Sequence, residues 1–377
     1  MAINRLANAL RTLGVLTGSL AANTAFAGWG ELNMTRGVTP ISQQQYDLHM
    51  IVFWICVAIG VVVFGAIVYS VINHRRSQGA EAAQFHENTT VEVLWTVVPI
   101  VILVAVAVPA TSTLLSLEDT SDADMTVQIT GYQWKWKYDY LGEDLSFFSN
   151  LSQESRDGIK ADPYAVENYL LDVDKPLVLP IKKKVRFVMT SADVIHAWWV
   201  PDLGVKQDTI PGFINDSWAY IEEPGVYRGQ CAELCGKDHG FMPIVVIAKA
   251  EPEYNQWVAD QKAAAVAAAA SADREWTRQE LMAKGEEVYN SACASCHQAN
   301  GQGIPGVFPG MVGSAITTGP VEDHIDIVVN GKPGTAMQAF GEQLTAAEVA
   351  AVVTYERNAW GIDTGDVVQP TAIAANK

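Results

Sequence analysis

The residues best suited to bind a metal ion gather around one pair of cysteines. They comprise two imidazoles, two thiols and a thioether: His196, Cys231, Cys235, His239 and Met242. Blue-copper sites use one Cys, two His and a weak axial Met, and this chain adds a second Cys to that set. Two thiolates would bridge two copper ions, each capped by one His, and Met242 and the Glu233 carbonyl would act as weak ligands. The alternatives are unrelated thiols or a structural zinc site, whose motifs favour paired Cys and paired His segments.

A second redox motif, Cys293-Ala-Ser-Cys296-His297, follows downstream. Two thiols at this spacing form thioethers with haem vinyl groups, and the adjacent His297 becomes the proximal iron ligand. A redox dithiol is the alternative, which the trailing His disfavours. His/Met ligation raises the haem potential, so the sixth ligand is expected to be a Met. Met337, 40 residues past His297 and before a predicted terminal helix at Thr345–Asn358, is the predicted ligand, with Met311 as the alternative.

The copper donors lie in a region whose pattern predicts an all-β domain. Short apolar segments divided by Gly, Pro and Asp run from Met125 to about Lys249. Aromatic and polar residues alternate from Tyr132 to Tyr140, which predicts one strand with an aromatic face. Further strands are predicted at Lys175–Ile181, Val185–Thr190, Ser217–Ile221 and Pro243–Ala248, with an irregular loop at 143–174. This spacing favours a Greek-key sandwich or barrel, with His196 at a strand end and the cysteine loop between the last two strands.

Two apolar runs precede this domain. Met50–Ile72 has no charge over 23 residues, about 35 Å as a helix, and is long enough to cross a bilayer. Val93–Leu117 is the second run, in which neighbouring helices would satisfy the groups freed by two prolines. The loop between them begins His74-Arg75-Arg76, which favours a cytoplasmic position. The sequence therefore predicts a two-span hairpin with both termini outside.

The N-terminus predicts export. Residues 1–27 combine Arg5 and Arg11 with an apolar run and end in Ala25-Phe26-Ala27, the pattern of a cleaved signal peptide. An uncleaved tail is the alternative. Of the five cysteines, Cys56 falls inside the first span and the other four belong to the two redox motifs, so none is left for a disulfide.

Charge narrows the choice of partners. The formal net charge is −17, which argues against nucleic acid as a partner and favours cationic ones. Residues 278–377 hold 5 Lys/Arg and 11 Asp/Glu, a net charge of −6. Such a surface would steer a basic cytochrome towards it, although acidity also serves solubility alone.

The amino-acid composition of the chain changes after the β domain. Ala263–Ala270 is of low complexity and predicts a helical spacer or a loose tether. Glu280–Asn290 then predicts a helical lead-in to the haem motif. The predicted organisation is a signal peptide (1–27), a transmembrane hairpin (28–120), an all-β domain (121–250), an alanine-rich linker (251–276) and a small all-α cytochrome c domain (277–377).

Residues 28–250 resemble subunit II of the haem-copper cytochrome c oxidases. The matching motifs are Val91–Pro99, Gly131–Trp136, His196–Gly204 and Gly229–Gly236. The resemblance implies a cupredoxin-like Greek-key barrel with a dinuclear copper A (CuA) centre. Its ligands would fall on His196, Cys231, the Glu233 carbonyl, Cys235, His239 and Met242. Quinol-oxidising relatives lack these ligands, so that branch is disfavoured.

The resemblance implies three further roles. The Glu233 side chain would reach a magnesium ion at the contact with subunit I. Trp134 would receive electrons from a donor, its alternative being a core aromatic. Glu92 would feed protons into a channel of subunit I, its alternative being an ordinary interfacial carboxylate.

These observations predict subunit II of a proton-pumping cytochrome c oxidase, of the bacterial type with a fused cytochrome c. Electrons would pass from an external cytochrome c-type donor through haem c and CuA to the haem/copper site of subunit I, with subunit III as a further partner. The chain would lie in the bacterial inner membrane with its large part on the periplasmic face. The alternatives are a free-standing membrane-anchored electron carrier and the CuA arm of a nitric oxide reductase. Glu92 favours the oxidase, because an anchor needs no positioned carboxylate.

Overall fold

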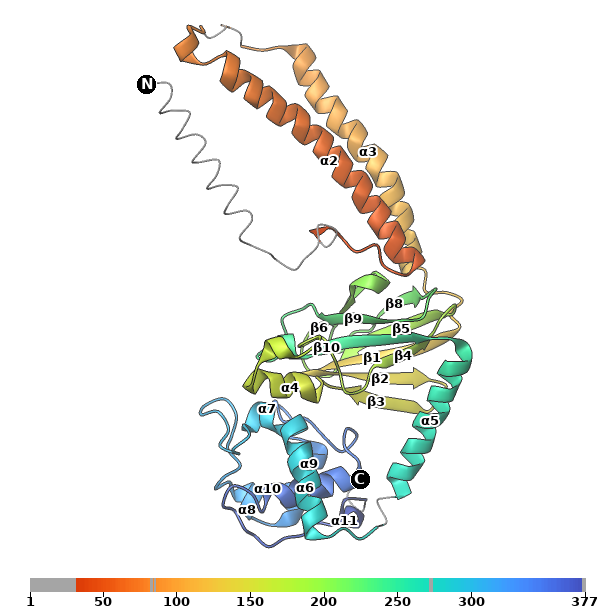
Figure 1. Ribbon diagram of the computed structural model, residues 1–377, viewed down its shortest axis with the longest axis vertical. Helices are drawn as coiled ribbons and strands as arrows, with labels where there is room; N and C mark the ends of the chain where they lie inside the picture. Colours follow the sequence, from red (N-terminus) through yellow and green to blue (C-terminus); the bar gives the residue numbers. More distant parts are fainter. Residues whose placement is uncertain (1–31, 82–83, 85, 271–273, 375–377) are drawn as a thin grey trace. The chain divides into compact units, whose positions relative to one another are not determined.

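The computed structural model describes residues 32–81, 84, 86–270 and 274–374 (Figure 1). The predicted signal peptide, residues 1–27, lies outside the described residues. The described chain forms two compact units. One comprises the residues up to Asp119 together with Pro201–Gly204, and the other comprises Thr120–Val200 and the residues from Val205 onward.

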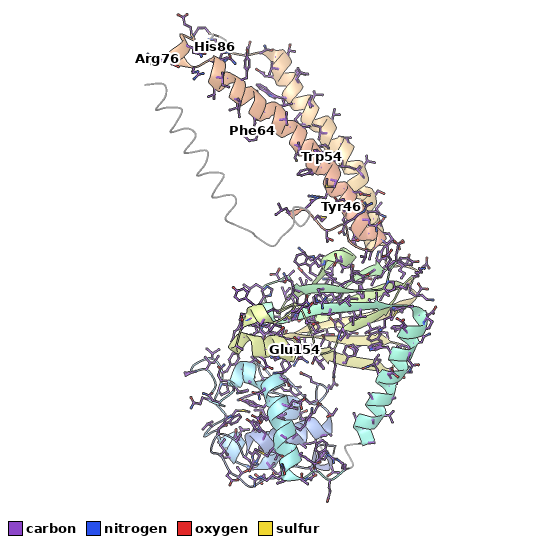
Figure 2. All side chains as sticks on the ribbon, in the orientation of Figure 1. Tyr46, Trp54, Phe64, Arg76, His86 and Glu154 are labelled. Atoms are coloured by element: carbon purple, nitrogen blue, oxygen red, sulfur yellow. The ribbon has the colours of Figure 1, made fainter. Side chains whose placement is uncertain are left out.

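The first unit is a pair of long apolar helices, as predicted for the hairpin. α2 spans Pro40–Asn73 and α3 spans Thr89–Glu118, joined through the short helix η2 (Arg76–Gln78). Both are long and apolar enough to cross a membrane. Figure 2 shows Trp54 and Phe64 along α2, and their exposed fractions are 62% and 68%. Such exposure of large apolar side chains suits contact with lipid, so the two helices fit a two-span membrane protein.

Hydrogen bonds fix the start of α2. Thr39 caps the helix and forms a capping box with Ser42. Its hydroxyl also donates to the Leu203 carbonyl at 2.9 Å, and the Gln45 side chain donates to the Gly204 carbonyl at 2.9 Å. The segment around η4 (Pro201–Leu203) thus anchors this end of the helix pair.

The second unit contains two five-stranded sheets, which confirms the all-β prediction. One sheet has the order β3-β2-β1-β5-β8 and the other the order β4-β10-β9-β6-β7. The first sheet consists of β1 (Met125–Tyr132), β2 (Lys135–Leu141), β3 (Leu145–Ser149), β5 (Lys184–Ser191) and β8 (Asn215–Tyr220). The second consists of β4 (Leu177–Pro180), β6 (His196–Val200), β7 (Val205–Thr209), β9 (Gly225–Cys231) and β10 (Pro243–Lys249). β1–β5 and β4–β10 pair in parallel, and the other pairs are antiparallel.

The prediction of one strand through Tyr132–Tyr140 is wrong. The chain reverses at Gln133 and Trp134, and Tyr132 pairs directly with Lys135. Directly opposed residues share a face, so Tyr132 lies on the face of Lys135. Trp136, Tyr138 and Tyr140 form the other face of β2, and this aromatic face is buried in the core. Alternation alone misses a two-residue reversal, because the aromatic spacing continues unchanged through the turn.

The segment 143–174 is more regular than predicted. It begins with β3, which the sequence analysis did not anticipate, and continues with α4 (Gln153–Lys160) and η3 (Pro163–Ala165). β7 and β9 were likewise not predicted as strands, because short segments with Gly, Lys and Asp give weak alternation. β6 begins at His196, and the cysteine loop lies between β9 and β10, as predicted.

A helix, α5 (Glu251–Ala270), leaves the second sheet. The ring of Trp257 lies 5.5 Å from that of Tyr140, and Lys262 forms an ion pair with Glu143 at 2.9 Å. Tyr254 is buried as well. The alanine-rich run is therefore a helical spacer rather than a loose tether over its described part.

The C-terminal part is helical, as predicted. Its elements are α6 (Arg278–Val288), the π-turn η7 (Tyr289–Cys293), α7 (Ala294–His297), α8 (Ala315–Thr318), α9 (Val321–Asn330), α10 (Ala346–Glu356) and α11 (Pro370–Ala374). Capping boxes at Thr277 and Thr345 start α6 and α10. These two helices cross closely at Gly285, where a Cβ would meet the Ala351 carbonyl at 2.2 Å. This crossing lies within a hydrophobic core that also includes Tyr289. The boundaries predicted between the modules stay predictions.

Candidate copper and haem sites

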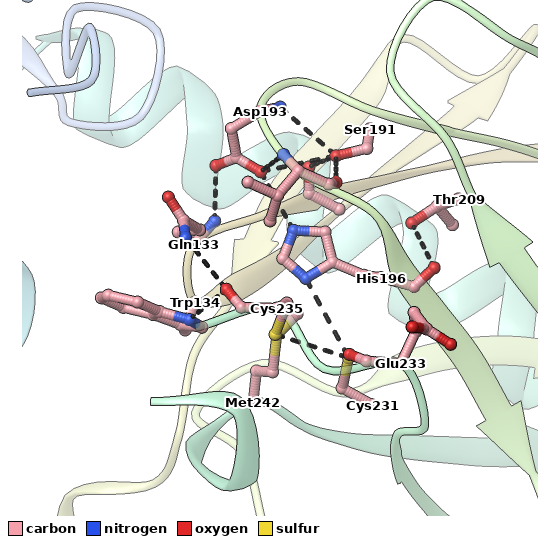
Figure 3. Close-up of polar contacts among 12 residues, drawn as sticks. Gln133, Trp134, Ser191, Asp193, His196, Thr209, Cys231, Glu233, Cys235 and Met242 are labelled. Atoms are coloured by element: carbon pink, nitrogen blue, oxygen red, sulfur yellow. Dashed lines mark hydrogen bonds and ion pairs between the residues drawn. The ribbon is translucent and has the colours of Figure 1, made fainter. Parts of the chain in front are cut away.

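The predicted copper donors converge at one end of the second sheet. β9 ends at Cys231, η5 (His239–Phe241) carries His239, and Met242 directly precedes β10. β6 pairs with β9 through Trp198 opposite Cys231, which brings His196 beside the cysteines. Figure 3 shows His196 and the sulfur residues facing one another across this space.

The distances associate one imidazole with each thiol. Cys231 Sγ lies 3.8 Å from Cys235 Sγ and 4.0 Å from His196 Nδ1. Cys235 Sγ lies 3.4 Å from His239 Nδ1 and 3.5 Å from Met242 Sδ. The arrangement has a pair of sulfurs at its centre and one ring nitrogen beside each of them.

Four of the six donor residues are buried, and His239 is partly buried. His196, Cys231, Cys235 and Met242 are all at most 5% exposed. Close approach of β1 depends on Gly131, where a Cβ would meet the His196 ring at 2.7 Å. This lack of space explains why a glycine begins the Gly131–Trp136 motif.

Glu233 presents two different groups to its surroundings. Its backbone carbonyl accepts from the Cys231 thiol at 3.3 Å, which places the carbonyl oxygen at the predicted copper site. Its side chain is exposed. The structure thus brings the carbonyl to the other donors, and the carboxylate lies outside that cluster.

The contact between the two thiols shifts their pKa values in opposite directions. The hydrogen bond from Cys235 lowers the pKa of Cys231, and the same interaction raises the pKa of Cys235. The hydrogen bond thus favours the thiolate at Cys231 and the thiol at Cys235. Both sulfurs would bind a metal ion as thiolates, because metal ligation requires the thiolate form.

Asp193 holds His196 in place and was not singled out from the sequence. Its Oδ1 lies 3.0 Å from His196 Nε2, and its Oδ2 accepts from the Gln133 N–H at 2.7 Å (Figure 3). Burial alone would lower the pKa of His196, but its hydrogen bonds with Asp193 and Cys231 raise it overall. Nε2 is held by the carboxylate, so Nδ1 faces Cys231 and would be the nitrogen that binds a metal. A carboxylate is the usual partner of the other ring nitrogen of a ligating His.

The backbone of the cysteine loop is held from β1 and β2. The Cys235 carbonyl accepts from Gln133 Nε2 at 2.9 Å and from Trp134 Nε1 at 3.1 Å. Trp136 Nε1 donates to the Met242 carbonyl at 3.2 Å. The hairpin turn and the start of β2 therefore position two of the predicted ligands, and Trp134 lies beside the site rather than in the core.

The donor set fits copper. It offers two thiols, two imidazole nitrogens, a thioether and a carbonyl, and soft sulfur ligands with imidazole suit copper. A structural zinc site needs only four donors and does not use a thioether. The residues that would hold a copper pair are His196, Cys231, Glu233, Cys235, His239 and Met242.

The predicted haem residues lie in the turn between α6 and the following loop. Cys293 ends the π-turn, and Cys296 and His297 lie in α7. His297 Nδ1 lies 2.8 Å from the Pro309 carbonyl. That contact sets the tautomer with the proton on Nδ1 and leaves Nε2 as the ligating nitrogen, so His297 fits a haem iron.

The two candidate methionines have different surroundings. Met311 is 8% exposed and belongs to the core. Met337 is partly buried and packs against the same core, as does Cys293. Its carbonyl accepts from the Lys332 N–H at 2.9 Å. Met311 therefore packs in the core, and Met337 as the iron ligand stays a prediction.

The remaining predicted site residue, Glu92, lies in the first unit. Its Oε1 accepts from the Asn88 N–H at 3.3 Å, and Asn88 caps α3 by accepting from Val91 N–H at 3.2 Å. Glu92 thus stabilises the start of α3. This is a structural role of the kind expected if Glu92 is an ordinary interfacial carboxylate.

Comparisons with known proteins divide the chain in the same way. The family described as cytochrome c oxidase subunit II, transmembrane domain, matches residues 27–112. Its periplasmic domain matches residues 125–249. The family described as cytochrome c oxidase, cbb3-type, subunit III, matches residues 280–355.

Curated relatives support this assignment. The probable cytochrome c oxidase subunit 2 of Rickettsia bellii is 38% identical over 224 residues, which is 59% of this chain and 81% of the relative. Cytochrome c oxidase subunit 2 of Triticum aestivum is 35% identical, over 67% of this chain and 97% of the relative. The periplasmic domain of subunit II from Bradyrhizobium japonicum is 40% identical over 38% of this chain and 96% of its own, with a TM-score of 0.34. The chain belongs to the cytochrome c oxidase subunit II family and carries a cytochrome c domain at its C-terminal end.

Proposed function

We propose that this chain receives electrons at a covalently attached haem c and passes them through CuA to the oxygen-reducing haem and copper of subunit I. The donor would be an external cytochrome c-type protein, drawn to the helical part by its net charge of −6. The oxidase as a whole would pump protons. No residue of this chain is assigned to oxygen binding.

One observation carries the proposal: two sulfurs 3.8 Å apart, each with an imidazole Nδ1 beside it. A copper pair bound there would exchange one electron with little change in geometry. The chain supplies a largely buried, prebuilt set of donors, with Asp193 fixing one imidazole. Such preorganisation keeps the ligand positions from relaxing when the charge changes.

Haem c would supply a second one-electron carrier held by thioethers from Cys293 and Cys296. His297 is oriented by Pro309, and Met337 would complete the ligation. Burial raises the pKa of both thiols, so they are poor metal-binding thiolates and suit a covalent structural role. Fusion of the two carriers replaces a bimolecular encounter with an intramolecular one.

Trp134 is the proposed residue through which electrons reach the copper site. Its indole donates to the Cys235 carbonyl, and its other neighbours in a small polar cavity include Ser291 and Ser295, which flank Cys293. One ring therefore lies next to the ligand loop on one side and next to the haem-attachment turn on the other.

Two carboxylates would serve the contact with subunit I. The exposed Glu233 side chain would reach a magnesium ion there, while its carbonyl stays with the copper donors. Glu92, at the start of α3, would deliver protons to a channel of subunit I. Subunit III would complete the assembly, which would lie in a bacterial inner membrane with residues from 120 onward on the periplasmic side.

The test is a gentle purification of the chain from its native membrane, with a reduced-minus-oxidised optical spectrum and quantified copper and haem. The expected result is haem c together with a-type haem and copper in excess of two per chain. Haem c with two coppers and no further haem would contradict the oxidase assignment and favour a free-standing carrier. Replacing both cysteines, Cys231→Ser and Cys235→Ser, should remove two coppers per chain and leave haem c in place.

A further inference from the structure

Gln338 connects the loop of the predicted iron ligand to the hydrogen bonds behind the copper donors. It directly follows Met337 in the chain. Its Nε2 donates to the Gln133 carbonyl at 2.6 Å and lies 3.5 Å from Asp193 Oδ2. The other oxygen of Asp193, Oδ1, lies 3.0 Å from His196 Nε2. Gln338 therefore connects Met337, the predicted iron ligand, to Asp193, which holds the predicted copper ligand His196.

The connection is continuous. From Met337 to His196 it consists of covalent bonds and two polar contacts, Gln338 with Asp193 and Asp193 with His196. A second branch runs through Gln133, whose side chain donates to the Cys235 carbonyl at 2.9 Å. Such a partly buried network keeps its geometry because each member is held by the next.

Other contacts hold the same surfaces together but lie off this line. The Lys135 ammonium donates to the Gln343 side chain and lies 4.8 Å from the centroid of the Phe340 ring. Lys237 Nζ donates to the Ser295 carbonyl at 2.6 Å. These cations face a helical segment of negative net charge, so they supply attraction. Among these contacts, Gln338 is the one adjacent to the predicted iron ligand.

We infer that Gln338 is a positioning residue for electron transfer from haem c to the copper pair, an inference that rests on the proposed function. In this step one electron leaves the ferrous iron, which becomes ferric, and the oxidised copper pair gains it. No bond breaks and no proton moves. Gln338 contributes by holding the Met337 loop against Gln133 and Asp193, so that the path between the two centres has no gap.

The test uses the full chain in its assembled, cofactor-loaded complex. Gln338→Leu keeps the size of the side chain and removes both donated contacts. Flash photoreduction of haem c, followed by the absorbance of the copper centre, measures the transfer rate. We expect a rate roughly tenfold lower, because losing a hydrogen bond shifts the docked population by about that factor.

Matched controls separate positioning from damage to either centre. Gln279→Leu changes an exposed glutamine of α6 and should leave the rate unchanged. In Gln338→Leu, the haem midpoint potential, the Met-to-iron absorption band and the copper EPR spectrum should all match wild type. Gln338→Glu is a second variant of nearly the same shape, in which repulsion from Asp193 should slow transfer at least as much.

The outcomes are distinct. A wild-type rate in both Gln338 variants would overturn the inference and leave the proposed function standing. So would a slower rate accompanied by a shifted haem potential, since that points to a disturbed Met337. If the wild-type complex itself shows no electron transfer from haem c to copper, the proposed function fails.

Discussion

Trp134 donates its indole N–H to the carbonyl of Cys235, at 3.1 Å. The contact joins a partly exposed ring to the backbone of a buried predicted ligand. It also places the ring in the two-residue turn between β1 and β2 rather than in a strand. The turn thus brings the indole against the loop that carries the predicted cysteine ligands.

Trp134→Phe tests this contact. The variant keeps an aromatic ring and loses the donor to the Cys235 carbonyl, so we expect copper to stay bound while its reduction by haem c slows. Flash-induced reduction followed at the copper absorbance measures the rate. Trp199→Phe is the control, because Trp199 is partly exposed on β6 and packs against Lys206. Equal rates in both variants would return Trp134 to the role of a packing aromatic.

Asp193→Asn should weaken copper binding. The amide is uncharged, so it holds the His196 ring less firmly. We expect a loss of about 10–100-fold in copper affinity, the usual effect of changing the partner of a ligating His. Competition with a copper chelator, on the full chain, measures it. Asp208→Asn, at an exposed position of β7, should have no effect. Unchanged affinity in Asp193→Asn would show that packing alone orients His196.

Lys135 should make stability depend on pH. Burial lowers its pKa to about 8, against the opposing influence of the Asp193 carboxylate. Between about pH 8 and 10.5 the unfolded chain binds more protons at this residue than the folded chain, so stability rises with pH in that window.

Lys135→Met removes this dependence. Relative to the variant, the wild type should gain up to about 3 kcal/mol as the pH rises from 7 to 10.5, the equivalent of the pKa change. Thermal unfolding by near-ultraviolet circular dichroism at several pH values measures the difference. A gap between wild type and variant that stays constant with pH would contradict the burial of a charge at this position.

Met337→Ala and Met311→Ala distinguish ligand from packing. We expect Met337→Ala to lose the Met-to-iron absorption band, to lower the haem potential and to slow oxidation of an added cytochrome. Met311→Ala should keep the band and lose about 2–5 kcal/mol of stability, because it opens a cavity in the core. If Met337→Ala leaves cytochrome oxidation unchanged, the serial route through haem c is wrong.

Glu92→Gln separates proton delivery from helix capping. Gln keeps the acceptor for the Asn88 N–H, so α3 should remain stable. Proton-coupled reduction of the oxygen site in subunit I should slow, while reduction of the copper pair should not. Stopped-flow spectroscopy of the oxidase resolves the two steps. A wild-type rate for both would leave Glu92 with its capping role alone.

The sequence predicted elements where the chemistry or the periodicity is strong. The apolar runs became α2 and α3, and the Cys231 and Cys293 motifs each fell on one loop or turn, as spacing required. It failed at Gln133 and Trp134, because alternation does not register a short reversal. Asp193 and Gln338 were also missed. Asp193 lies only three residues before His196, but nothing in the pattern of the segment shows that its carboxylate turns back to the ring. The partners of Gln338 are distant in sequence, so only the docked loop brings them together.

The helix α5 has a consequence for how this chain tolerates change. Its first turns are fixed by Tyr254 and Trp257, while the alanines after Lys262 are mostly exposed. Substitution among those alanines therefore costs little. An inserted or deleted residue is different, because it would turn the end of the helix by about 100° and shift it by about 1.5 Å. The helix therefore tolerates substitutions better than insertions or deletions. Adding or removing a whole helical turn would preserve the direction in which the chain leaves α5.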